Sequence, residues 1–228
     1  MGKNKLKRFA EMKSFGNVFE PHFSEVFGHD FFMKGNWNEK FFRNNNPVII
    51  ELGCGKGEYT LNLAMMHKDI NFIGIDRKGA RIWRGALTAL EKQMHNVAFL
   101  RTRIELIDSF FSQGEVQSIW ITFPDPHLSK SGEKHRLTSP RFLNLYSRFL
   151  KPDGAINLKT DSFELFSYTC DTIENTGSKM LFASPDLYNS NIKDKVLSIK
   201  TFYENQHLAD GKKICYIKFT LPVLNNGS

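Results

Sequence analysis

A glycine-rich segment flanked by acidic residues is the part of this sequence best suited to bind a small molecule. The segment is Glu51-Leu52-Gly53-Cys54-Gly55-Lys56-Gly57, and it follows an apolar run that begins at Val48. Glycines allow the backbone to turn tightly and to approach a ligand closely. Asp76 lies 19 residues after Gly57, at the end of a second apolar run. An acidic residue at that position can accept hydrogen bonds from both hydroxyls of an adenosine ribose, which predicts a nucleoside-containing cofactor.

The glycine spacing distinguishes two classes of cofactor. A dinucleotide site requires G-x-G-x-x-G, so that a helix N-terminus faces a pyrophosphate. Here the spacing is G-x-G-x-G, and Glu58 would place a carboxylate where the pyrophosphate should lie. S-adenosylmethionine carries an ammonium, a sulfonium and a ribose but no phosphate, and the ammonium is a natural partner for Glu51. We therefore predict S-adenosylmethionine, bound by Glu51, Gly53, Gly55 and Asp76, over a nucleotide oxidoreductase or a purely structural turn.

A second group of polar residues follows the fourth apolar run, in Thr122-Phe123-Pro124-Asp125-Pro126-His127. The two prolines hold Asp125 in an extended conformation, at the carboxyl end of a strand where the transferred group should lie. The polar segment from Leu128 to Leu137 comes next and contains Lys130, Lys134 and Arg136. We expect this loop to contact phosphates, which dominate nucleic-acid affinity. A turn aspartate and a solvated loop are the alternatives.

The elements that must position these residues are predicted from the apolar periodicity. Short apolar runs predict strands at 48–52, 71–76, 97–100, 118–123, 155–159 and 213–221. Helical spacing predicts helices at 59–66, 79–94, 139–150 and 162–174, and Lys-Pro-Asp-Gly at 151–154 predicts a turn. Strands that alternate with helices indicate an α/β fold with a doubly wound, mostly parallel sheet and helices on both faces. Such sheets bind ligands at the carboxyl ends of their strands.

Length and charge constrain the domains and the partner. The 228 residues fit a basic, partly flexible extension at 1–46, a single domain at 47–222 and a flexible tail at 223–228. The net charge of +7 favours a polyanionic partner. The N-terminal cations could hold an RNA backbone, although a tail without a role is an alternative; they are Lys3, Lys5, Lys7 and Arg8.

Cysteine usage and hydropathy bear on the compartment. The three cysteines have no CxxC spacing, so neither a disulfide framework nor a zinc site is expected. No apolar run approaches membrane-spanning length, and the basic start has no apolar h-region, so we expect neither a membrane span nor a secretory signal. We expect a cytoplasmic enzyme without a metal, as a monomer or homodimer.

Taken together, these motifs resemble the bacterial tRNA (guanine-N7)-methyltransferase family. The resemblance extends from about Pro47 to Phe219 and rests on VIIELGCGKGEYTLNLA, FIGIDRK, ITFPDPH, RLTSPRFL, LKPDGAINLKTD and TFYE. It implies a seven-stranded Rossmann-like methyltransferase sheet. It also implies transfer of a methyl group from S-adenosylmethionine to N7 of a guanine in tRNA, in the variable loop.

The resemblance also assigns roles to individual residues. Glu51 and Asp76 match the family's cofactor carboxylates, and Asp125 matches an acid that is both a cofactor contact and the catalytic residue. Arg103 stands where the family usually has Asp or Asn near the adenine, so Arg103, Thr102 or the backbone is expected to supply that contact. Four further residues match substrate-binding positions: Lys130, Asp161, Thr201 and Glu204.

The chemistry of guanine N7 limits what the protein must supply. This nitrogen has a free lone pair and loses no proton on methylation, so His127 is expected to stack or pack rather than act as a base. Asp125 and Asp161 can accept hydrogen bonds from guanine N1–H and N2–H₂ once the base is splayed out. Catalysis would then consist of alignment and electrostatic stabilisation.

Two other functions remain open at this point. A methyltransferase for a small molecule would not need the basic loop. A non-catalytic RNA-binding protein would not need Glu51, Asp76 and Asp125 together.

Overall fold

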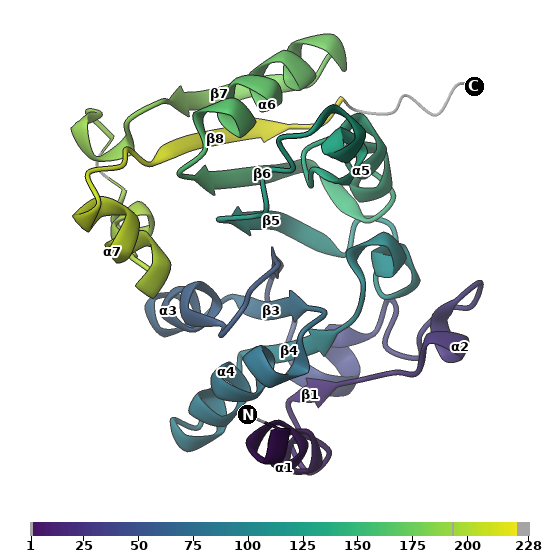
Figure 1. The fold of residues 1–228 in the computed structure, drawn as a ribbon. Helices are drawn as coiled ribbons and strands as arrows, with labels where there is room; N and C mark the ends of the chain where they lie inside the picture. The colour runs from purple at the N-terminus through teal and green to yellow at the C-terminus, as the bar shows by residue number, and fades with distance from the viewer. Residues whose placement is uncertain (1, 193, 223–228) are drawn as a thin grey trace, which may run out of the picture.

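A twisted, mostly parallel sheet forms the centre of the protein (Figure 1). The computed structural model describes residues 2–192 and 194–222, with side chains from residue 6. Eight strands of this described part follow the order β1-β4-β3-β2-β5-β6-β8-β7. Their bounds are β1 Val18–Phe19, β2 Val48–Leu52, β3 Asn71–Asp76, β4 Val97–Arg101, β5 Val116–Thr122, β6 Leu150–Thr160, β7 Lys179–Ser184 and β8 Cys215–Thr220.

Helices connect most of these strands. The α-helices are α1 Gly2–Met12, α2 Phe23–Val26, α3 Glu58–Met66, α4 Gly79–Glu91, α5 Pro140–Tyr146, α6 Phe163–Asn175 and α7 Phe202–Ala209. Shorter turns of helix are a π-helix at Trp37–Phe42 and 3₁₀ helices at Ile104–Ser109, Lys130–His135, Leu187–Asn189 and Lys195–Ser198. The doubly wound α/β class predicted from the sequence is confirmed.

Each face of the sheet has its own apolar core. One face packs against α5, α6 and the segment before β2, through residues such as Trp37, Tyr146 and Leu165. The other packs against α1, α3, α4 and the segment 187–199, through residues such as Tyr59 and Ile82. Because both faces are covered, the central strands are almost uniformly apolar, which is the reason that short apolar runs predicted them correctly.

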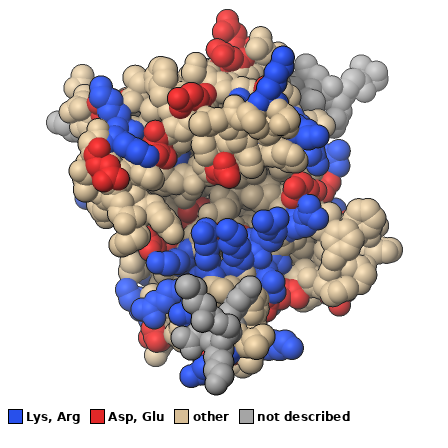
Figure 2. All heavy atoms as spheres, viewed as in Figure 1, with Lys and Arg blue, Asp and Glu red and all other residues tan. Residues whose placement is uncertain are grey.

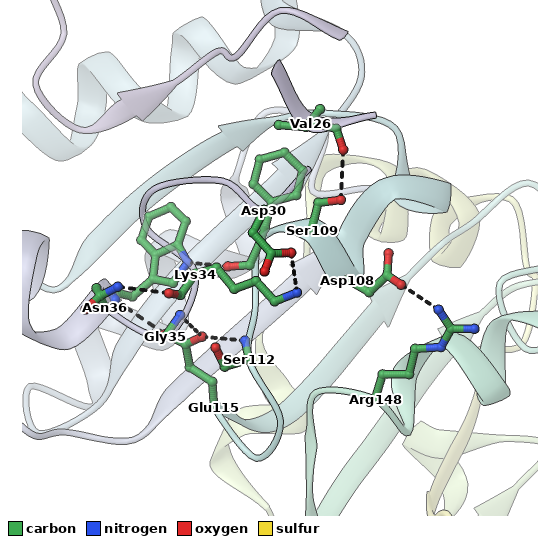
Figure 3. Close-up of polar contacts among 12 residues, drawn as sticks. Val26, Asp30, Lys34, Gly35, Asn36, Asp108, Ser109, Ser112, Glu115 and Arg148 are labelled. Carbon is green, nitrogen blue, oxygen red and sulfur yellow. Dashed lines mark hydrogen bonds and ion pairs between the residues drawn. The ribbon is translucent and has the colours of Figure 1, made fainter. Parts of the chain in front are cut away.

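The strand count differs from the seven expected, because β1 adds an eighth strand beside β4. Val18 pairs in parallel with Phe99 and Phe19 with Leu100. Figure 3 shows how the following segment is fixed to the body of the protein: Glu115 accepts hydrogen bonds from the backbone N–H groups of Gly35 and Ser112, both at 2.8 Å. Part of the predicted extension therefore contributes to the core.

The predicted turn at 151–154 lies inside strand β6. Val116 pairs with Leu150, but Ser118 pairs with Ala155, so β6 has three more residues than β5 between these pairs, and a bulge accommodates them. Turn-forming residues here interrupt the pairing without ending the strand. The helix expected at 139–150 is shorter for a related reason, since it ends at Tyr146 and the chain then turns directly into β6.

Candidate active site

The carboxyl ends of β2, β3 and β5 open onto two adjoining hollows. The large cleft has a volume of about 590 Å³, and the small pocket, of about 100 Å³, lies beside it. Gly53, Arg81 and Phe123 line both. The large cleft also contains Asp76, Thr102, Arg103, Asp125 and His127, and the small pocket also contains Glu51, Gly55, Thr122, Thr201 and Tyr203.

The glycine loop has the backbone that its sequence predicts. Gly53, Gly55 and Gly57 have φ of 75°, 57° and 72°, a region that residues with a Cβ rarely adopt. Space around Gly53 and Gly55 is open, whereas a Cβ on Gly57 would lie 2.6 Å from the Phe99 ring. The first two glycines thus keep the hollows accessible, and the third allows α3 to pack against β4.

Glu51 is a buried carboxylate at the inner end of the small pocket, only 3% exposed. It accepts hydrogen bonds from the Thr60 backbone N–H at 2.9 Å, from the Thr60 hydroxyl, and from the Thr122 hydroxyl at 2.5 Å. Burial raises the pKa of Glu51 to about 7, although these hydrogen bonds oppose the shift. A buried acid with this pKa is suited to receive a cation that restores its charge.

Asp76 connects the second strand to the glycine loop. Its two carboxylate oxygens accept hydrogen bonds from the backbone N–H of Gly55 at 3.0 Å and of Lys78 at 2.7 Å. Each oxygen keeps a further lone pair that can accept from a ligand. The carboxylate is thereby fixed at the edge of the large cleft, where two neighbouring hydroxyls can reach it.

The structure places both Thr102 and Arg103 in the wall of the large cleft. Thr102 is nearly buried, at 9% exposed, whereas the Arg103 side chain is 56% exposed and lies 3.9 Å from Glu105. Thr102 and the adjoining backbone are therefore better placed than the Arg103 guanidinium to contact a base inside the cleft.

Asp125 lies in the large cleft with its side chain 74% exposed. Its Oδ1 accepts a hydrogen bond from the His127 backbone N–H at 3.0 Å, which closes a turn over Pro126. Phe123 and His127 on either side have positive φ of 49° and 43°. Backbone strain of this kind is concentrated at functional sites, and here it fixes where the carboxylate points.

The basic loop after Asp125 divides into exposed and buried cations. Lys130 and Lys134 are exposed on the 3₁₀ helix that starts at Lys130. Arg136 is buried, and its guanidinium donates to the carbonyl oxygens of Pro126 at 3.0 Å and His127 at 3.1 Å. The expectation that Arg136 contacts phosphate is corrected: it holds the Asp125 loop in place.

Asp161 follows the end of β6, next to the end of β5. Its carboxylate lies 2.8 Å from the Lys212 ammonium and 3.4 Å from the His207 ring. His207 in turn stacks on Phe123, with ring centroids 5.8 Å apart. Asp161 is thus joined to the wall of the two hollows through His207, and it lines neither hollow itself.

The late Thr and Glu residues have separate positions. Thr201 lines the small pocket and caps α7, where its hydroxyl accepts from the Glu204 N–H at 3.2 Å. Glu204 is fully buried, 2.7 Å from the ammonium of Lys159, and it accepts a hydrogen bond of 2.5 Å from the Tyr188 hydroxyl. The expected substrate contact by Glu204 is corrected, because this carboxylate anchors α7 to β6.

Sequence reasoning missed several residues that complete the site. Thr60 and Thr122, which hold Glu51, lie within the motifs already quoted, but they are uncharged and were given no role. Arg81 lines both hollows from the first turn of α4, five residues after Asp76. Its spacing from Asp76 was the available signal, since the first helical turn after a strand faces the same edge of the sheet.

Within the residues the structure describes, no group of three His, Cys, Asp or Glu side chains could hold a metal ion. The helices of residues 2–192 and 194–222 include none that is long and apolar enough to cross a bilayer.

Together the sheet order, the glycine loop and the carboxylates at the strand ends define a Rossmann-like methyltransferase. The chain is similar in fold to a 16S rRNA methyltransferase, KamB, with a TM-score of 0.61 and 14% identity over 81% of this chain and 92% of that one. Residues 45–217 match the family model described as "Putative methyltransferase".

Sequence relatives narrow the class to a family. The tRNA (guanine-N(7)-)-methyltransferase of Bacteroides fragilis is 52% identical, over 97% of this chain and 87% of the relative. That of Christiangramia forsetii is 51% identical, over 96% of this chain and 98% of the relative. The chain belongs to the tRNA (guanine-N7)-methyltransferase family.

Proposed function

We propose that the protein transfers the methyl group of S-adenosylmethionine to N7 of a guanine in the variable loop of tRNA. The observation that carries this proposal is the convergence of Glu51, Asp76 and Asp125 on two adjoining hollows, in a chain whose relatives are named tRNA (guanine-N(7)-)-methyltransferases. A small-molecule methyltransferase would share the first two acids, but it would have no use for the exposed lysines beside the cleft.

The residues present fit S-adenosylmethionine. Glu51 would bind its ammonium group in the small pocket, and Asp76 would accept hydrogen bonds from the ribose hydroxyls. The large cleft, at about 590 Å³, is within the range of small-molecule sites and can take an adenosine together with a base. When bound, S-adenosylmethionine supplies a methyl group on a sulfonium.

Asp125 is the proposed catalytic residue. Its Oδ1 is held by the His127 N–H, and among the described residues no donor contacts its Oδ2. This carboxylate can accept from guanine N1–H and N2–H₂, which orients N7 and stabilises a purine that becomes cationic. N7 has no proton to lose, so the reaction needs no base. The His127 ring therefore packs within the loop and does not act as a base.

The substrate would be held further from the reacting atoms by Lys130, Lys134, Asp161 and Thr201. The two lysines are exposed beside the cleft and are suited to phosphates. The Asp161 carboxylate is shared with the half-exposed Lys212, so its contact with a base would require an exchange of partners.

The test is direct. The protein is incubated with methyl-labelled S-adenosylmethionine and unmodified tRNA, and the product is treated with borohydride and aniline, which cleave the chain at N7-methylguanine. We expect label in tRNA and one cleavage site, within the variable loop. Label in another base, or cleavage elsewhere in the tRNA, would overturn the corresponding part of the proposal.

A further inference from the structure

A groove outside the two hollows contains an unusual concentration of cations. This α3–α4 groove has a volume of about 860 Å³ and lies between helices α3 and α4, with α1 at one end. Five basic residues and one acidic residue are among those that line it: Arg8, Lys56, Arg81, Arg84, Lys92 and Glu58. Figure 2 shows Lys and Arg side chains gathered in a band across this face of the molecule.

The cations of the groove are available to a ligand. All five are exposed, and within the described part of the chain none of them forms an ion pair. The single acid, Glu58, is already engaged, because it accepts a hydrogen bond from the Phe202 backbone N–H at 2.6 Å. Five positive charges against one negative charge favour an anionic ligand with multiple charges.

The spacing of the cations fits a chain of phosphates. Arg81 and Arg84 lie on α4 and Lys92 is the C-cap residue of this helix, and the 11 residue steps from Arg81 to Lys92 span about 16 Å at 1.5 Å per residue. Arg8 reaches the groove from α1, with its guanidinium 4.6 Å from the centre of the Trp83 ring. Such a line of cations matches a phosphate backbone rather than a single small anion.

The groove is also continuous with the site. Arg81 lines the groove, the small pocket and the large cleft, and Lys56 lines the groove and the small pocket. A polyanion that enters the cleft with one nucleotide can therefore continue into the groove.

From these observations we infer that the α3–α4 groove binds the phosphate backbone of the substrate tRNA, away from the methylated nucleotide. This inference rests on the proposed function. It assigns the groove to the part of the tRNA that does not react, and thus to affinity rather than chemistry.

The test uses Arg84→Gln/Lys92→Gln, which changes two cations that line only the groove. The matched control is Arg141→Gln/Lys179→Gln, which removes the same two charges at exposed positions on α5 and β7. Binding of tRNA is measured between about 50 and 200 mM salt. For the groove variant, we expect the slope of log affinity against log salt to flatten by about two, and affinity at about 0.1 M salt to fall at least tenfold.

Further measurements separate the possible outcomes. Both variants should bind S-adenosylhomocysteine as the wild type does, and both should methylate tRNA at the wild-type rate when tRNA is saturating. An unchanged salt slope in the groove variant, or an equal loss of tRNA affinity in the control, would overturn the inference. The groove would then be a solvated surface or a binding site for an acidic protein. A wild-type protein that fails to methylate tRNA would instead overturn the proposed function.

Trp83 supplies an independent signal. Its indole is partly exposed in the groove, whereas Trp37 and Trp120 are buried at 0% and 7% exposed. Binding of tRNA should therefore change the tryptophan fluorescence of the wild type, and Trp83→Phe should lose most of that change. A change that persists in this variant would contradict contact with RNA at the groove.

Discussion

Replacing Glu51 by glutamine should stabilise the cofactor-free protein above neutral pH and weaken its binding of the cofactor. The amide has almost the same shape, and the Thr60 and Thr122 hydroxyls can reorient toward it. In the wild type, burial raises the pKa of Glu51 from 4.5 to about 7. At about 1.4 kcal/mol per pH unit, this difference corresponds to about 3 kcal/mol between the two protonation states.

The direction of the pKa shift determines how Glu51 affects the stability of the folded protein as the pH changes. Because the pKa of Glu51 is higher in the folded state, its stability contribution is complete below about pH 4.5 and is lost as the pH rises through about 7. Glutamine does not titrate and avoids this loss. The free energy of unfolding of Glu51→Gln, relative to the wild type, should therefore increase by about 2 to 3 kcal/mol between pH 5 and pH 8, measured by denaturant titration.

Cofactor binding should instead favour the wild type over Glu51→Gln. Wild-type affinity for S-adenosylhomocysteine, measured by calorimetry, should rise toward pH 7 as Glu51 ionises and can pair with the ligand ammonium. Glu51→Gln should lack the rise and bind about 10 to 100 times more weakly at pH 7.5, the scale of a lost charge-assisted hydrogen bond.

The control is Glu174→Gln, at an exposed position on α6. It should follow the wild type in both measurements. If Glu51→Gln retains the wild-type pH dependence of unfolding, then burial does not raise the Glu51 pKa. If Glu51→Gln retains the wild-type pH dependence of S-adenosylhomocysteine binding, then Glu51 does not contact the ligand ammonium.

Three other predictions concern Asp125, the basic loop and Glu204. Asp125→Asn should slow single-turnover methylation at least about a hundredfold with little change in tRNA affinity, whereas His127→Ala should cost less; the reverse order would refute the carboxylate mechanism. Lys130→Gln/Lys134→Gln should flatten the salt dependence of tRNA binding by about two units, and an unchanged slope would assign the loop to solvent. Glu204→Gln should lower the free energy of unfolding by about 3 kcal/mol in denaturant titration, because it leaves a buried ammonium without its partner; a loss near zero would contradict this role.

Much of the fold was predictable because its signals are local. The central strands are buried on both faces, so Val48–Leu52 and Asn71–Asp76 are apolar runs with unambiguous ends. The glycine loop was equally clear, since positive φ at Gly53 and Gly55 restricts the residue type. The edge strands β1 and β7 escaped prediction because one is only two residues long and the other alternates between exposed and partly buried positions.

The roles of charged residues were only partly predictable. Arg136 lies in a basic run and Glu204 in a T-x-x-E motif, and both patterns indicate substrate contact. Their charges are instead satisfied inside the protein, by loop carbonyl oxygens and by Lys159. The sequence shows which residues carry charge, but whether a charge faces solvent or a partner depends on contacts between segments distant along the chain.

By itself the sequence determined the class of fold, the cofactor loop and the acids that end the strands, because each depends on backbone conformation or on burial within a short segment. Tertiary structure decided the rest. It brought Thr60 and Thr122 together around Glu51, although Thr122 lies 71 residues after Glu51 in the sequence. It also aligned the cations of α1, the glycine loop and α4 along one groove, which follows from helix packing and which no local pattern could reveal.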